Sequence, residues 1–157
     1  MLLRIICIGK TGKKFLEEGE KEYLSRLVKY VPAEIIVLPD VKNAKSLSEA
    51  QIKDAESKLF FQKIGEAETI FLLDERGKQY ASTEFSAFLQ DQFNRGGKAV
   101  NFLIGGPYGF DDKIYQRANG LISLSKMTFS HQMVRMFFLE QLYRGMTILK
   151  GEPYHHQ

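Results

Sequence analysis

Apolar residues along this chain follow two different spacings, one typical of β-strands and one typical of α-helices. Residues 2–8 form a short apolar run that Gly9 ends, which predicts a buried strand. Pro32 ends the helical pattern that follows, and residues 35–38 predict a second strand. Within that first helix, apolar side chains recur at helical spacing: Phe15, Leu16, Tyr23, Leu24, Leu27 and Val28.

The alternation continues through the middle of the chain. Residues 46–49 read Ser-Leu-Ser-Glu and fit a capping box, which predicts a helix start. Residues 69–73 predict a third strand and residues 74–78 a polar turn after it. We expect the helices on either side of this strand to bury Ile52, Ala55, Leu59, Phe60, Phe85, Phe88 and Leu89.

The last third predicts two more strands and two more helices. The strands are expected at residues 99–104 and 121–124, and the helices at residues 111–118 and 130–150. Strands separated by helical segments indicate an α/β fold with a mostly parallel sheet covered by helices on both faces. No linker or repeat interrupts the pattern, so we expect a single domain over residues 1–157.

The final predicted helix is apolar on nearly every side. Its apolar positions are Met133, Val134, Met136, Phe137, Phe138, Leu139, Leu142, Tyr143, Met146, Ile148 and Leu149. Such a helix is either deeply buried or shared with a partner, and in a small domain we expect a homodimer packed through it.

Composition excludes several classes of protein. The single cysteine, Cys7, cannot form an intramolecular disulfide, and three histidines with one cysteine make a poor zinc set, so we expect no metal. No apolar run reaches the length of a membrane span, and no signal peptide opens the chain, so we expect a cytoplasmic protein. Residues 113–157 carry six Lys and Arg against two Glu, a pattern compatible with a nucleic-acid partner or with a solvated helix face.

Two glycine-rich segments resemble nucleotide-binding loops without matching them. Residues 9–14 lack the spacing of a phosphate-binding loop, and residues 105–109 lack the dinucleotide fingerprint because Pro107 replaces a required glycine. The second segment follows a strand, so it is either a tight turn or a ligand loop at the carboxyl end of a parallel sheet. His131 fits a structural donor or a proton-transfer group equally well.

Four motifs in the C-terminal half resemble the RlmH family, the bacterial pseudouridine N3-methyltransferases of large-subunit ribosomal RNA, which are small members of the SPOUT superfamily. The motifs are Leu-Ile-Gly-Gly-Pro at 103–107, Leu-Ser-Lys-Met-Thr-Phe-Ser-His-Gln-Met-Val-Arg at 124–135, Glu-Gln-Leu-Tyr-Arg at 140–144 and Pro-Tyr-His at 153–155. The resemblance implies a C-terminal trefoil knot, a homodimer and S-adenosylmethionine as cofactor. By position it implies a cofactor pocket lined by Leu73, Gly105, Leu124, Ser125, Lys126, Met127, Thr128 and Phe129.

The resemblance also implies a substrate-side group made of His131, Glu140, Arg144, Tyr154 and His155, acting on 23S rRNA in the assembled ribosome. N3 of pseudouridine must lose its proton before it can attack a methyl group, so a base or an anion-stabilising group is needed. Our hypothesis is that Arg144 holds a phosphate or the developing oxyanion, Tyr154 contacts the base, and His155 or His131 assists proton removal. Many tails of the family end in a basic residue after Tyr-His, whereas this chain ends His156-Gln157.

Two alternatives share much of this pattern. One is a SPOUT methyltransferase with another RNA target, and the other is a ribosome-binding relative that has lost catalysis. Binding of S-adenosylmethionine without turnover on any ribosomal particle would favour the second.

Overall fold

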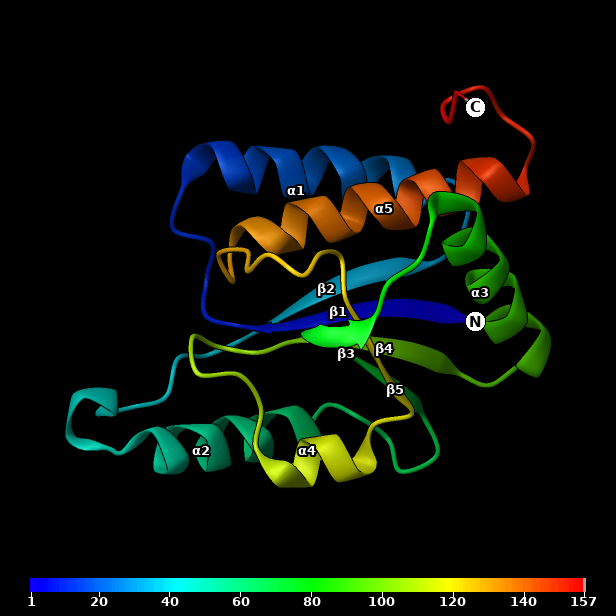
Figure 1. The fold of residues 1–157 in the computed structure, drawn as a ribbon. Helices are drawn as coiled ribbons and strands as arrows, with labels where there is room; N and C mark the ends of the chain where they lie inside the picture. Colours follow the sequence, from blue (N-terminus) through cyan, green and yellow to red (C-terminus); the bar gives the residue numbers. More distant parts are fainter. Residues whose placement is uncertain (157) are drawn as a thin grey trace.

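The fold is built on a five-stranded, all-parallel sheet in the order β2-β1-β4-β3-β5 (Figure 1). A computed structural model describes residues 1–156, and Gln157 lies outside the described residues. The strands are β1 (Leu2–Ile8), β2 (Ala33–Leu38), β3 (Thr69–Lys78), β4 (Ala99–Ile104) and β5 (Gly120–Ile122). The predicted α/β fold with a parallel sheet is therefore confirmed.

Helices cover both faces of the sheet (Figure 1). They are α1 (Lys14–Leu27), α2 (Glu49–Phe61), α3 (Ser82–Arg95), α4 (Asp112–Arg117) and α5 (Met133–Leu149), with a short 3-10 helix η1 (Ala44–Ser46). The face under α1, α3 and α5 holds the larger core, in which Phe102 of β4 meets Phe138 of α5 edge-on. The other face packs on α2 and α4 through residues such as Phe60 and Ile114.

Two local sequence predictions were wrong. The capping box lies two residues further on, because the Ser48 hydroxyl accepts from the Gln51 amide while the Gln51 side chain accepts from the Ser48 amide. Residues 74–78 extend β3 instead of turning, and the register with β5 shifts between Leu73 and Lys78. Of the apolar positions at helical spacing in α1 and directly after it, Phe15 and Val28 are exposed, Phe15 at 62%.

The apolar character of α5 is largely explained within one chain. This helix packs between α1 and α3 against the sheet, and it buries Phe138, Leu139, Leu142 and Met146 completely or nearly so. Met133 and Phe137 remain more exposed, at 38% each.

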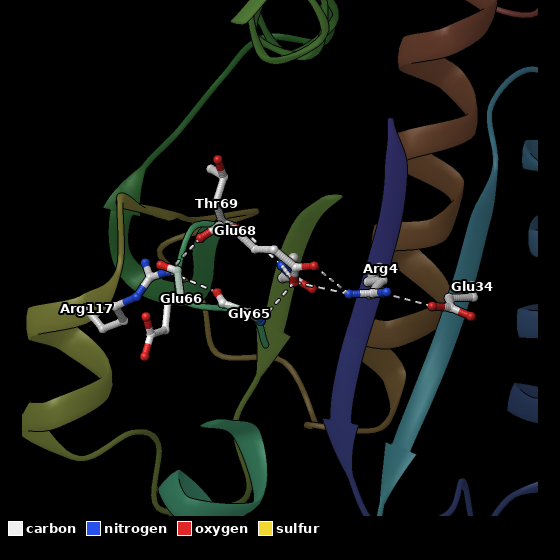
Figure 2. Close-up of polar contacts among 8 residues, drawn as sticks. Arg4, Glu34, Gly65, Glu66, Glu68, Thr69 and Arg117 are labelled. Carbon is white, nitrogen blue, oxygen red and sulfur yellow. Dashed lines mark hydrogen bonds and ion pairs between the residues drawn. The ribbon is translucent and has the colours of Figure 1, made fainter. Parts of the chain in front are cut away.

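A polar network connects the strands at the amino-terminal end of the sheet (Figure 2). Arg4 of β1 donates through Nε to Glu34 of β2 and through Nη1 to Glu68, just before β3. Asn101 of β4, which is fully buried, also donates to Glu68, and Arg117 of α4 donates to the Glu68 backbone carbonyl. The network joins four strands at the end of the sheet opposite to the glycine-rich segment that follows β4.

Across residues 1–156, the helices are all too short or too polar to span a bilayer.

Candidate active site

A pocket of about 660 Å³ opens at the carboxyl ends of β3, β4 and β5, where ligands bind in open parallel sheets. Strand ends and the segment that connects β5 to α5 form most of its wall, and the first turn of α5 closes it with Val134. The apolar part of the wall consists of Leu73, Ile104, Phe110, Ile122, Leu124 and Phe129.

The Gly105–Gly109 segment is both a tight turn and a wall of this pocket, so the two interpretations left open by the sequence are compatible. The Gly109 amide donates to the Gly106 carbonyl at 3.0 Å, and Gly109 has a positive φ of 78° that favours glycine. A Cβ on Gly105 would lie 3.3 Å from the Gly109 carbonyl carbon. At its glycines, the turn therefore presents backbone atoms to the pocket without a covering side chain.

The connection from β5 to α5 supplies most of the predicted cofactor residues. Leu124, Ser125, Met127, Thr128 and Phe129 all line the pocket, as do Leu73 and Gly105. The Thr128 hydroxyl donates to the Glu75 carboxylate at 2.6 Å, which holds this connection against the extended end of β3. Lys126 is the one residue of the predicted set that does not contribute to the pocket wall.

Sequence reasoning missed a polar cluster in the pocket wall. Asp74 and Arg76 come from the end of β3 and Tyr115 from α4, and all three line the pocket. Burial raises the pKa of Asp74, but hydrogen bonds from Arg76 and Tyr115 outweigh it and lower that pKa to about 2. Burial and the bond to Asp74 raise the pKa of Tyr115 to about 12. Residues 74–76 directly follow a predicted parallel strand, and this position could have identified them from the sequence as pocket residues.

His131 lines the pocket from the α5 side, apart from the other predicted substrate residues. Burial is the main cause that lowers its pKa, and the nearby charge of Arg135 adds to it while Asp40 opposes it. His131 is consequently neutral at pH 7 and able to accept a proton.

The other four predicted substrate residues lie together near the end of α5. Arg144 pairs with Glu140 one turn earlier, and its Nη1 lies 3.4 Å from Nδ1 of His155. Tyr154 donates to Glu140 at 3.0 Å, and its ring lies 4.8 Å from the Arg144 guanidinium. Burial and the bond to Glu140 raise the pKa of Tyr154, so its hydroxyl stays protonated. Tyr143, which contacts Tyr154 at 4.7 Å between ring centroids, extends this aromatic group.

Within one chain, the pocket and this cluster of substrate residues lie apart. Val134 is the last pocket residue on α5, and Glu140 and Arg144 follow it by six and ten residues. At 1.5 Å per residue the two sets are about 9 Å and about 15 Å apart along the helix axis.

Within the described chain, no three His, Cys, Asp or Glu side chains are grouped so as to hold a metal ion.

Comparison with known proteins places this site in a family. The family profile described as "Predicted SPOUT methyltransferase" matches residues 1–155. The chain therefore belongs to the SPOUT methyltransferase family.

Its full-length relatives are more specific. The chain is 52% identical to the ribosomal RNA large subunit methyltransferase H of Christiangramia forsetii and 51% identical to that of Flavobacterium johnsoniae, and each comparison covers 100% of both chains. The resemblance to this group that the C-terminal motifs indicated is therefore confirmed.

Solved structures share the fold at much lower identity. A probable methyltransferase from Bordetella pertussis matches with a TM-score of 0.56 and 8% identity, over 92% of this chain and 93% of that one. A probable methylase family protein from Haemophilus influenzae matches with a TM-score of 0.54 and 9% identity, over 99% of this chain and 70% of that one.

Proposed function

We propose that this protein transfers a methyl group from S-adenosylmethionine to N3 of a pseudouridine in 23S rRNA of the assembled ribosome. One observation carries the proposal. Seven of the eight cofactor residues that the family motifs imply line the pocket at the carboxyl ends of the strands. They do so in a chain that is 52% identical over its whole length to a ribosomal RNA large subunit methyltransferase H.

The residues present fit S-adenosylmethionine. A volume of about 660 Å³ lies in the range of small-molecule pockets, roughly 300–1,000 Å³. Leu73, Leu124 and Phe129 offer apolar contact for an adenine, and the glycine turn offers backbone groups at close range. Glu75 supplies negative charge for a ligand that carries a sulfonium and an ammonium group. When bound, the cofactor supplies an electrophilic methyl group.

The chain's own residues then have to remove one proton and hold the resulting anion. His131 is neutral, lines the pocket and accepts the N3 proton in our proposal. Arg144, held by Glu140, stabilises the negative charge that develops on the base or binds an adjacent phosphate. Tyr154 stays protonated and contacts the base, and His155 beside Arg144 is the second candidate for proton removal.

We propose a homodimer packed through α5 because it would complete this site. Exposed apolar side chains gather at the amino-terminal ends of α1 and α5: Phe15, Phe129, Met133 and Phe137. The two helices run in the same direction, as the Gly12 amide contacts Gln132 and the Tyr23 ring contacts Tyr143. A two-fold axis that crosses α5 between Val134 and Arg144, close to the exposed Phe137, would place the Arg144 cluster of one subunit near the pocket of the other.

The finer fold assignment rests on family membership. We propose that the chain is one SPOUT domain and that its C-terminal part, which includes β5 and the segment leading to α5, is threaded through a trefoil knot. The agreement of the family profile over residues 1–155 supports this, as does the contribution of that segment to the pocket.

Methyl incorporation from labelled S-adenosylmethionine into different particles tests the proposed function. We expect incorporation into assembled ribosomes and much less into naked 23S rRNA. Incorporation into transfer RNA alone would favour a different RNA target, and cofactor binding without incorporation into any particle would favour a non-catalytic relative. Either result would overturn the proposal.

A further inference from the structure

Arg76 is the only Lys or Arg among the described residues that line the pocket. Its side chain is 69% exposed, yet it is held firmly. Nε and Nη2 each donate to one oxygen of Asp74 at 3.1 Å, and the guanidinium lies 5.1 Å from the Tyr115 ring centroid. Asp74 itself is only 10% exposed, so the arginine is anchored on a buried carboxylate.

The anchoring leaves part of the guanidinium available. Arginine has five N–H donors in a planar fork, and Asp74 and Tyr115 engage only Nε and Nη2. No hydrogen bond within residues 1–156 engages Nη1. An arginine that is prepositioned in this way loses little conformational entropy when it binds a further anion.

The neighbouring charges do not cancel this donor. Asp74 engages Nε and Nη2 of Arg76, so a further anion meets the Nη1 donors of the guanidinium. Glu75 also lines the pocket, and its carboxylate accepts from the Thr128 hydroxyl. Among the described residues of the pocket wall, Arg76 alone therefore offers guanidinium donors to an anion.

We propose that Arg76 binds the carboxylate of the methionine moiety of S-adenosylmethionine, with Asp74 and Tyr115 as positioning residues. This inference rests on the proposed function. S-adenosylmethionine has a single anionic group, its carboxylate, and residues 1–156 contribute a single permanent cation, Arg76, to the wall of the pocket. A guanidinium recognises a carboxylate through charge-assisted hydrogen bonds. Arg76 thus determines specificity for the amino-acid end of the cofactor.

Equilibrium binding of two cofactor forms tests this assignment by calorimetry, without catalysis. Decarboxylated S-adenosylmethionine keeps the adenosine, sulfonium and amine but lacks the carboxylate. We expect wild-type protein to bind S-adenosylmethionine about tenfold more tightly than the decarboxylated form, the size of one hydrogen bond to a charged group. Arg76→Gln should weaken S-adenosylmethionine about tenfold, leave the decarboxylated form unchanged, and so remove the preference.

Two further variants keep the test interpretable. Arg76→Lys retains the charge without the fork and should lose part of the preference, which covers the case in which Arg76→Gln fails to fold. Lys113→Gln removes a cation from α4 that pairs with Asp54 and does not line the pocket, and it should leave both affinities unchanged.

Three results would overturn the assignment. Equal weakening of both cofactor forms by Arg76→Gln would mean that Arg76 only supports the pocket. Unchanged binding of both forms, with a loss confined to the affinity for ribosomes, would mean that the anion is an RNA phosphate. Wild-type protein that binds neither form would refute the proposed function itself, which the first two results leave intact.

Discussion

Arg135 is the largest fully buried side chain among residues 1–156, with 1% of the residue exposed, and its guanidinium is buried with it. It donates to the carbonyls of Ile8 and Gly9 at the end of β1 and to the hydroxyl of Thr11, which in turn donates to Glu20. These contacts tie the start of α5 to the sheet, immediately beside His131 in the pocket.

Removal of Arg135 should therefore destabilise the fold. We expect Arg135→Ala to lower the free energy of unfolding by about 3 kcal/mol, because buried carbonyls lose charged donors and a cavity forms. Urea denaturation measures the loss. Arg95→Ala, at the exposed end of α3, is the control and should change stability by less than about 0.5 kcal/mol. A loss of that small size for Arg135→Ala would show that the contacts are not needed.

The ionisation of Asp74 should make the free energy of unfolding depend on pH in the acid range. Its pKa is lowered in the folded state to about 2 from an ordinary value of 3.8, so its contribution is complete above pH 3.8 and is lost as pH falls toward 2. We expect Asp74→Asn to be less stable than wild type at neutral pH and to approach it near pH 2. Parallel stability curves for the two proteins across this range would refute the assignment.

The ionisation of His131 belongs to catalysis. Since burial lowers the pKa of His131 below 6.5, we expect kcat/KM to fall with acid below that pH as the imidazole becomes protonated. His131→Gln should reduce kcat by about 100-fold and abolish this acid limb. An unchanged pH profile in the variant would leave His155 as the proton acceptor.

Residue-level predictions from the sequence grouped residues well where a motif gave the position and failed where packing decided the outcome. Seven of the eight predicted cofactor residues line one pocket, and their role in cofactor binding stays a prediction. Helical spacing also identifies an apolar position without showing which neighbour covers it, and Phe15 is exposed. The Asp74–Arg76–Tyr115 cluster combines two elements, β3 and α4, whose proximity the sequence does not reveal.

At the scale of elements, the extension of β3 beyond Leu73 decides the shape of the pocket. The sequence of residues 74–78 is polar and contains a glycine, which is why it predicts a turn. The strand continues instead because Lys78 pairs with β5 after a register shift, and the Ser123 amide donates to the Lys78 carbonyl at 2.9 Å. Long-range pairing thus overrides local propensity, as is common for strands.

Gly77 is the residue that permits this pairing. A Cβ there would lie 2.6 Å from backbone atoms of Leu121 and Ile122, closer than real contacts allow. We expect Gly77→Ala to destabilise the protein by about 1–3 kcal/mol and to weaken cofactor binding, because β5 leads into the pocket segment. Gly65→Ala is the control, as its Cβ would meet Glu68 at an ordinary 3.4 Å. Equal stability of both variants in thermal unfolding would contradict this account.

At the scale of the whole molecule, the fold class follows from regular alternation, which is why it could be anticipated from the sequence, whereas the strand order could not. The separation of the pocket from the Arg144 cluster could not be anticipated, because it depends on which residues of α5 pack beside the strand ends that form the pocket. This separation is also the strongest reason for a dimer, since Glu140 and Arg144 lie about 9 Å and about 15 Å along the α5 axis from the last pocket residue of that helix.

Mixed dimers should recover activity if the site spans two subunits. A pocket variant, Leu124→Asp, and a cluster variant, Arg144→Ala, are each expected to be nearly inactive alone. Co-expressed in equal amounts, they should give about a quarter of wild-type turnover, because half of the dimers would be mixed and each would contain one intact site. No recovery from dimers that demonstrably mix would place the whole site within one chain.

The most direct test of the central claim is the identity of the methylated nucleoside. Ribosomes that lack this modification would be incubated with the protein and S-adenosylmethionine, and the large-subunit RNA would be digested and examined by mass spectrometry. The account predicts one new product, N3-methylpseudouridine, in 23S rRNA. A methyl group on any other nucleoside, or none in the presence of bound cofactor, would contradict it.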